Sequence, residues 1–86
     1  MKRIIDDENG KAMENLLGEV VTIFACRYIY TGKLTGIGEF EIELSDPSIV
    51  YETGPFDKKE WGDVQKLPHD KWYIALGSIE SFGIMK

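Results

Sequence analysis

The sequence predicts a mainly β fold, in which a short N-terminal helix precedes a five-stranded, strongly bent and partly open barrel. Apolar residues alternate with polar ones over several short runs, which is typical of strands that bury one face. Glycines interrupt the run at residues 30–44, and glycine tolerates the sharp bend that a strand makes in a very small barrel. The 86 residues leave room for one domain, which we expect to span residues 1–86 with its barrel at about 19–82.

The expected helix covers about residues 8–17. Its apolar side chains fall on one helical stripe, and Gly18 then supplies a glycine stop. A β-branched run at residues 19–25 predicts the first strand, whose apolar side chains lie on both faces and therefore need cover on both sides. We expect the helix to provide the second cover, and residues 26–28 to form a tight reversal.

Two further strands are expected at residues 29–37 and 39–44. In the second of them apolar and acidic residues alternate strictly, so one face points into the barrel and the other forms an acidic ladder in solvent. The apolar set is Phe40, Ile42 and Leu44, and the acidic set is Glu39, Glu41 and Glu43. Residues 46–48 interrupt this alternation. Residues 49–52 resume it, either as a continuation of the same strand or as a separate one.

Residues 53–70 are expected to form a long polar loop, because they are dense in turn-forming residues. The loop contains Phe56 and Trp61, two aromatics that must either fold back onto the barrel or contact a partner. Strands at residues 71–76 and 78–82, joined by Gly77, complete the barrel.

Composition narrows the range of partners. The chain has 10 Lys and Arg against 15 Asp and Glu, which gives a formal charge of -5 and an isoelectric point near 4.8. This sign disfavours general coating of nucleic acid, although a local basic patch can still form. The residues that could form it are Arg27, Lys33, Lys58, Lys59, Lys66 and Lys71. The single cysteine and the absence of a long apolar run predict a cytoplasmic protein with no membrane partner.

The sequence offers little support for catalysis or metal binding. The only histidine, His69, lies in a turn-like segment, so neither Cys26 nor a serine has an evident base beside it. One cysteine and one histidine cannot supply a tetrahedral ligand set. We therefore expect no enzyme activity, no cofactor and no metal, and we expect Cys26 to be a small buried filler.

Two short blocks resemble the sequence motifs of the Sm-like family, including its bacterial host-factor RNA-chaperone branch. The first block spans residues 32–44, with its glycines and its alternation. The second is Ala-Leu-Gly-Ser-Ile at residues 75–79. Together with the helix before the first strand, the resemblance covers about two thirds of the chain. It implies an Sm-like barrel, which is an SH3-like fold, and a scaffold role in RNA metabolism.

The resemblance also implies a homo-oligomeric ring of about five to seven subunits. In such rings the last two strands of adjacent subunits pair edge to edge, which hides the edges that a small open barrel leaves exposed. The residues that this pairing would place at the subunit interface are Tyr73, Ile74, Leu76, Ile79 and Phe82.

The base pocket of the family corresponds to four positions of this chain, namely Gly38, Glu39, Phe40 and Gly77. Its basic half is missing, because the family's Arg-Gly becomes Leu76-Gly77 and the Lys-His pair of the bacterial branch falls on Tyr73-Ile74. A phosphate there would be repelled by the neighbouring glutamates. From its alternation with the next apolar residues, Phe40 is itself expected to be a core residue.

Three hypotheses for function remain. If RNA binds, we expect contacts outside the degraded pocket, at the loop lysines or at Arg27, Tyr28, Tyr30 and Lys33. The second hypothesis is an acidic protein-interaction module that holds a partner with Phe56 and Trp61 and binds no RNA. The third is a monomeric SH3-like barrel whose aromatics Tyr28, Tyr30 and Trp72 bind a peptide.

Overall fold

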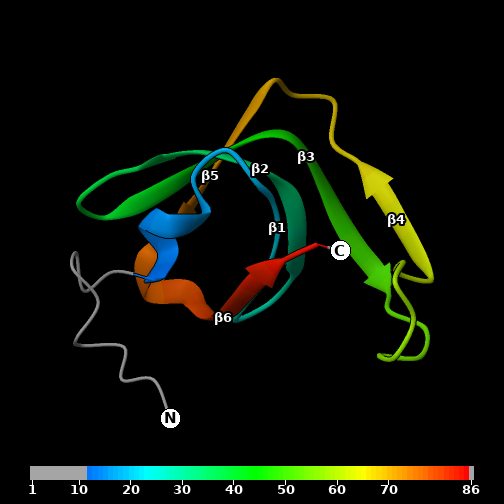
Figure 1. The fold of residues 1–86 in the computed structure, drawn as a ribbon. Coiled ribbons are helices and arrows are strands. Elements are labelled where there is room, and N and C mark those ends of the chain that lie inside the picture. The colour runs from blue at the N-terminus through cyan, green and yellow to red at the C-terminus, as the bar shows by residue number, and fades with distance from the viewer. Residues whose placement is uncertain (1–11, 86) are drawn as a thin grey trace, which may run out of the picture.

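Six antiparallel strands form one curved sheet in the computed structural model, which describes residues 12–85 (Figure 1). The strands are β1 (Val20–Ala25), β2 (Ile29–Ile37), β3 (Glu41–Glu52), β4 (Asp63–Lys66), β5 (Lys71–Ala75) and β6 (Ile79–Ile84). Their order is β4-β3-β2-β1-β6, and β5 also pairs with β3. Because β5 and β6 do not pair with each other, the sheet is not closed into a barrel. The mainly β prediction is confirmed, with six strands in place of five.

β3 is a single long strand that has two different partners along one side. Its residues 41–45 pair with β5, and its residues 48–52 pair with β4. Asp46 and Pro47 mark the change, since Asp46 has φ 55° and the register with β2 shifts here. Residues 49–52 therefore continue the same strand, because a bulge absorbs the polar interruption.

Gly32 of β2 lies close to this bulge. A Cβ atom at Gly32 would lie 3.0 Å from the carbonyl oxygen of Ser45 and 3.3 Å from the Cβ of Leu44. Glycine thus lets the two strands approach more closely than a side chain would allow.

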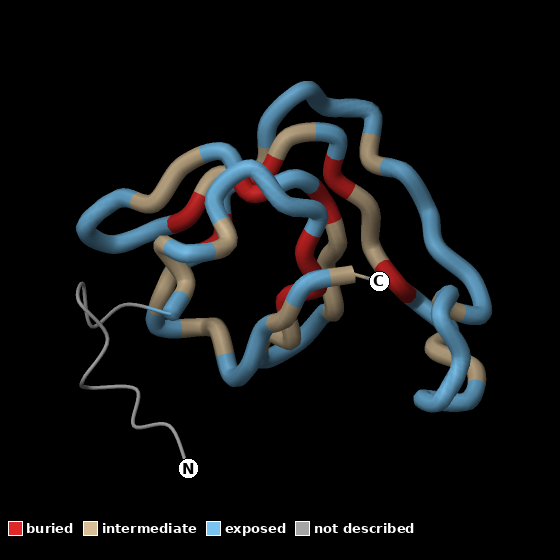
Figure 2. The backbone as a smooth tube through the Cα atoms, viewed as in Figure 1, coloured by how far each residue is buried: buried red, intermediate tan, exposed pale blue. Residues whose placement is uncertain are grey.

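The core comes from β1, β2, β3 and β5. Its fully buried members are Val21, Ile23, Leu34, Ile42 and Leu44, and Ile74 of β5 is 5% exposed. Figure 2 shows these buried segments close together within the curve of the sheet. β4 and β6 contribute no buried residue.

The prediction that Phe40 belongs to the core is wrong. β3 begins at Glu41, two residues later than expected, and residues 38–41 form the turn between β2 and β3, which we call the hairpin tip. The N–H of Gly38 donates a hydrogen bond to the carbonyl oxygen of Glu41 at 2.7 Å and closes this turn. Phe40 is therefore 74% exposed, because the alternation ends where the strand ends.

The described part of the N-terminal segment is a 3-10 helix, η2 (Ala12–Leu16). The first residues of the expected helix, 8–11, lie outside the described residues. Met13 and Leu16 pack against the core. Gly18 has φ 90°, and its N–H donates a hydrogen bond to the carbonyl oxygen of Leu34 at 2.8 Å, so this glycine turns the chain into β1.

Residues 53–70 are not a loop throughout, which corrects the prediction. β4 lies within them and pairs with residues 48–52 of β3, of which residues 48–50 also pair with β2 on the other side. We call β4 together with this half of β3 the arm (Figure 1). All four residues of β4 are exposed, so no alternation in the sequence marks this strand. At the other end of the sheet a 3-10 turn, η3 (Leu76–Ser78), joins β5 to β6.

Candidate functional site

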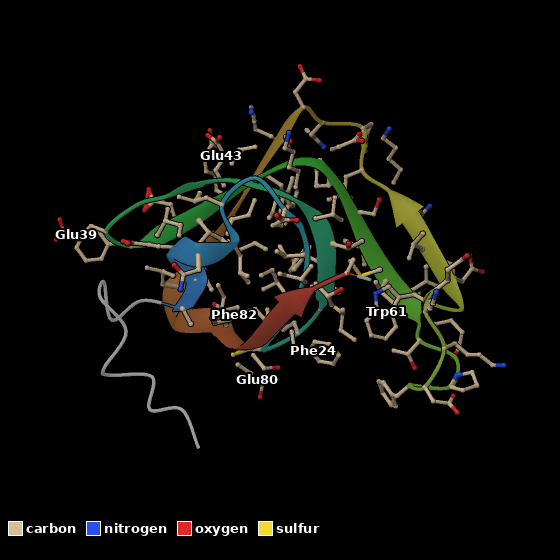
Figure 3. All side chains as sticks on the ribbon, viewed as in Figure 1. Phe24, Glu39, Glu43, Trp61, Glu80 and Phe82 are labelled. Carbon is tan, nitrogen blue, oxygen red and sulfur yellow. The ribbon has the colours of Figure 1, made fainter. Side chains whose placement is uncertain are left out.

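A groove of about 650 Å³, which we call the Trp61 groove, lies between β1, β6 and the segment that leads to β4. Its lining consists of Thr22, Phe24, Phe56, Asp57, Lys58, Lys59, Trp61, Ser81, Phe82, Gly83, Ile84 and Met85. Figure 3 shows Trp61 reaching from this segment toward Phe24 of β1. The groove therefore has a strand pair as one wall and a folded-back segment as the other.

Trp61 is anchored to β1. Its Nε1 donates a hydrogen bond to the Oγ1 of Thr22 at 3.3 Å, and its ring meets the Phe24 ring edge-on with centroids 5.9 Å apart. Thr22 and Phe24 alternate with core residues, so they lie on the face of β1 turned away from the core. The sequence predicted cover on both faces of this strand, and Trp61 instead of the helix covers this face.

Two glycines allow the segment to fold back. Gly54 has φ 67°, and the N–H of Gly62 donates a hydrogen bond to the carbonyl oxygen of Thr53 at 2.9 Å. A Cβ atom at Gly62 would lie 3.0 Å from both the Glu52 carbonyl oxygen and the Gly54 nitrogen. Because Gly62 directly follows Trp61, this close backbone approach determines the position from which the Trp61 side chain projects.

Phe56 is the accessible aromatic of the groove. Its side chain is 73% exposed, and its ring lies edge-on to Trp61 with centroids 6.2 Å apart. Lys58 and Lys59 line the groove together with Asp57, so the charged lining is net positive in a chain of net charge -5. The exposed Phe56 ring lies beside the anchored Trp61 ring, and charged side chains surround both. Such a surface can bind an apolar anchor residue of a protein partner.

A second pocket, of about 290 Å³, gathers Arg27, Tyr28 and Tyr30, and we call it the Arg27 pocket. The rings of Tyr28 and Tyr30 lie edge-on with centroids 6.1 Å apart. Tyr73 of β5 adds a third phenol, which the sequence did not place here. Cys26 also lines this pocket and is exposed, so the expectation of a buried filler is wrong, because Cys26 lies in the turn between β1 and β2.

The basic residues that the sequence grouped do not all line one pocket. Lys33 lines a different pocket, together with Asp46. The Lys66 ammonium lies 2.7 Å from a carboxylate oxygen of Asp46, and the hydrogen bond between them raises the pKa of Lys66. The Lys71 ammonium lies 3.5 Å from a carboxylate oxygen of Glu43. Lys33 and Lys71 lie opposite Ser45 on the two strands that flank β3, so these lysines are near one another, each with a carboxylate close by.

The positions that correspond to the family's base pocket lie together. The N–H of Leu76 donates a hydrogen bond to the carbonyl oxygen of Phe40 at 2.8 Å, so η3, which holds Gly77, contacts the hairpin tip. The charged side chains of the tip are Glu39 and Glu41, both exposed, and a Glu41 carboxylate oxygen accepts a hydrogen bond from the Phe40 N–H at 3.2 Å. The tip repels phosphate and favours a cationic partner.

Glu43 lies on β3 beside the hairpin tip and accepts two hydroxyl hydrogen bonds. The Oγ1 of Thr35 donates at 2.7 Å and the phenol of Tyr73 at 3.0 Å. These bonds, with a smaller contribution from Lys71, lower the pKa of Glu43 below its usual range. The same bond to Glu43 raises the pKa of Tyr73.

The residues expected at the subunit interface fall into two groups. Ile74 belongs to the core, and Leu76 and Ile79 are half-buried against it. Tyr73 and Phe82 are 59% and 37% exposed and lie on β5 and β6. Each of these two strands pairs with a neighbour on one side only within the described sheet, so two strand edges remain open to pairing.

In the part of the chain that the structure describes, no three His, Cys, Asp or Glu side chains come close enough together to hold a metal ion. His69 instead packs beside Trp72, with ring centroids 5.2 Å apart. Trp72 packs against the core and does not line the Arg27 pocket. None of the helices in residues 12–85 has both the length and the apolar character needed to cross a membrane.

Neither the models of known protein families nor the curated protein sequences match this chain. The geometry of its own residues must therefore indicate the function. Sequence patterns singled out Phe56 and Trp61 but missed their partners Thr22 and Phe24. The one signal that could have found these partners is the β-branched run of β1, which requires cover on its second face.

Proposed function

We propose that this chain is an Sm-like, ring-forming subunit that acts as a protein-interaction scaffold, with the Trp61 groove as its binding site. The observation that carries the proposal is the Phe56 ring, 73% exposed, held edge-on against the anchored Trp61. An apolar side chain of a partner that enters this groove removes aromatic surface from water. A single buried anchor of this kind contributes on the order of 1.5–3 kcal/mol.

The assembly part of the proposal is supported by the open edges of β5 and β6, two of the three strands in the described sheet that pair on one side only, the third being β4. β5 and β6 have similar lengths, five and six residues, and lie in different parts of the sheet order. Pairing of β5 of one subunit with β6 of the next is a head-to-tail contact, which forms a ring when its rotation closes. It would give hydrogen-bond partners to both edges and would cover Tyr73 and Phe82.

Light scattering tests the assembly. We expect the purified chain to have the mass of about five to seven subunits. We expect Ala75→Glu to lower that mass because a carboxylate then lies in the strand interface, at an exposed position of β5 that does not line the Trp61 groove. Val64→Glu is the matched control, since Val64 is exposed on β4, away from β5 and β6. A wild-type monomer at all concentrations would contradict the ring.

Peptide selection tests the groove. Peptides selected from a displayed random library on the wild-type protein should bind Phe56→Ala at least about tenfold more weakly, which corresponds to 1.4 kcal/mol. The exposed position of Phe56 makes a folding defect in this variant unexpected. Tyr51→Ala removes another exposed ring, 62% exposed, from the neighbouring arm and serves as the control. Equal binding by both variants would exclude the groove as the site.

RNA binding at the Arg27 pocket is a second candidate function, which the gathering of Arg27, Tyr28 and Tyr30 favours. A base stacked on an aromatic ring gains about 1–3 kcal/mol, and the guanidinium can contact phosphate. In fluorescence anisotropy at low salt, Tyr28→Ala should weaken the binding of mixed oligoribonucleotides more than Lys33→Ala does, because Lys33 lies outside the Arg27 pocket. If the wild-type protein binds none of them, RNA is excluded.

A further inference from the structure

Two phenylalanines project into solvent from separate surfaces of the molecule. Phe40 on the hairpin tip is 74% exposed, and Phe56 in the Trp61 groove is 73% exposed. Figure 3 shows the tip, labelled at Glu39, and the groove, labelled at Trp61, on opposite sides of the sheet. Single exposed apolar residues are common, but the charged side chains around these two differ, with glutamates on both sides of Phe40 and Asp57, Lys58 and Lys59 in the groove of Phe56.

The charges of the two surfaces are complementary. At the hairpin tip, Phe40 lies between Glu39 and Glu41, and both glutamates are exposed. The groove carries two exposed lysines, Lys58 and Lys59, neither of which forms an ion pair among the described residues. Asp57 lines the groove as well, so its charged lining sums to one positive charge, against two negative charges at the tip. The charged lining of the groove is therefore complementary to the tip, and Glu60 is the one further acid of residues 57–60, outside that lining.

We infer that the occupant of the Trp61 groove is the hairpin tip of a second copy of this chain. Phe40 of one copy enters beside Phe56 and Trp61 of the next, and the two glutamates of the tip face the two lysines of the groove. This inference rests on the proposed function of the groove as a protein-binding site, and it identifies the partner.

Two backbone hydrogen bonds hold the hairpin tip in its conformation. The hydrogen bond from Gly38 to Glu41 closes the turn, and the hydrogen bond from Leu76 to the Phe40 carbonyl oxygen ties it to η3. A preorganised turn loses little conformational entropy on binding. On the groove side, Gly83 leaves the wall open, since a Cβ atom there would have no atom within 4 Å.

The contact has a simple consequence for assembly. Every copy carries one tip and one groove on different surfaces, so each copy can donate its tip to one neighbour and accept the tip of another. Such a head-to-tail contact is heterologous and extends into a ring or a filament. It uses the turn between β2 and β3 and the outer wall of β1 and β6, and it is therefore a contact additional to the pairing of strand edges.

Reciprocal charge reversal tests the inference. One variant carries Glu39→Lys and Glu41→Lys, and the other carries Lys58→Glu and Lys59→Glu, all at exposed side chains. Each variant alone places like charges across the contact, and we expect its self-association to weaken at least about tenfold in sedimentation velocity at low salt. In an equimolar mixture, the basic tip of the first variant can bind the acidic groove of the second. The unaltered tip of the second variant can bind the unaltered groove of the first, so association should return to the wild-type level.

Two apolar variants complete the test. Phe40→Ala should weaken self-association by at least about tenfold, with Tyr51→Ala as the control for loss of an exposed ring. Gly83→Leu should have a similar effect, because a Cβ atom at this position would have no atom within 4 Å and the larger side chain would occupy the groove. Circular dichroism of every variant should match that of the wild-type protein.

The outcomes separate this inference from the proposed function. If the mixture of charge-reversed variants fails to recover association, the second copy is not the occupant. If Phe56→Ala then still loses the selected peptides, the groove binds a different protein and the proposed function stands. If Phe56→Ala alters neither peptide binding nor self-association, both are overturned.

Discussion

The two halves of β3 belong to regions of opposite character. Residues 41–45, between β2 and β5, place Ile42 and Leu44 in the core with no exposure to solvent. Residues 48–52 pair with β4 in the arm, where Val50 is the only buried residue of this half of β3. One strand thus joins the region that stabilises the fold to the region that leads into the Trp61 groove. Changes in the arm should therefore affect binding far more than stability.

The largest difference between the two regions should come from truncating one apolar side chain in each. Leu44→Ala removes a fully buried side chain from the core half and should lower the free energy of unfolding by about 2–5 kcal/mol. Val64→Ala truncates a side chain that is 45% exposed on β4 and should cost less than about 0.5 kcal/mol. Urea denaturation measures both values. Similar losses would mean that the arm is part of the core.

A backbone change sharpens the comparison at Gly62, which lies outside the arm at the end of the segment that leads into β4. Gly62→Ala places a Cβ atom 3.0 Å from two backbone atoms, which cannot move aside as a side-chain end can. We expect a loss of about 1–3 kcal/mol and a shift of tryptophan emission as Trp61 moves. Gly36→Ala on β2 is the control, because its nearest atom would be the Glu43 Cβ at 3.4 Å, an ordinary contact. If both variants lose the same free energy of unfolding, the close backbone approach at Gly62 carries no strain.

A smaller effect is expected where the groove segment is anchored to β1. Thr22→Val keeps the shape of the side chain but removes the acceptor for the Trp61 indole and the donor to the Met85 sulfur. The free energy of unfolding should fall by about 1 kcal/mol. Thr35→Val removes a hydroxyl at an exposed site and should change it less. Thermal denaturation followed by circular dichroism distinguishes the two variants.

The smallest effect concerns pH. Hydrogen bonds from the hydroxyls of Thr35 and Tyr73 lower the pKa of Glu43 in the folded state relative to the unfolded chain. The contribution of Glu43 to stability is therefore present above its unfolded pKa and is lost as the pH falls through its folded pKa. Glu43→Gln should reduce the fall in melting temperature between about pH 6 and about pH 3, and Tyr73→Phe should reduce it by less. An identical fall in all three proteins would contradict this coupling.

The fold was predictable where one face of a strand is buried. Strict alternation located Ile42 and Leu44 in the core and predicted the run of β2, because burial of one face imposes a period of two on the sequence. β4 had no such signature, since all four of its residues are exposed and its pairing depends on backbone hydrogen bonds. Phe40 continued the alternation in the sequence but lies in a turn. In a turn the strand geometry no longer determines whether a side chain faces the core or the solvent.

The candidate sites were predictable only as single residues. Phe56 and Trp61 stand out as aromatics in a polar segment, yet Thr22, which anchors Trp61, is 39 residues away in sequence. The expected RNA contacts separate in the same way. Arg27 shares a pocket with three tyrosines, whereas Lys33 lines another pocket beside Asp46.

The sequence by itself determined the mainly β character, five of the six strands, the turn between β1 and β2, and the charge and aromatic character of the exposed segments. These properties depend on local backbone preferences and on the period of the buried residues. The tertiary structure decided that β3 changes partners at Asp46 and that Trp61 covers β1. It also decided that the hairpin tip with Phe40 and the Trp61 groove with Phe56 are separate surfaces of one molecule. Such features depend on contacts between residues distant in sequence, which no local pattern specifies.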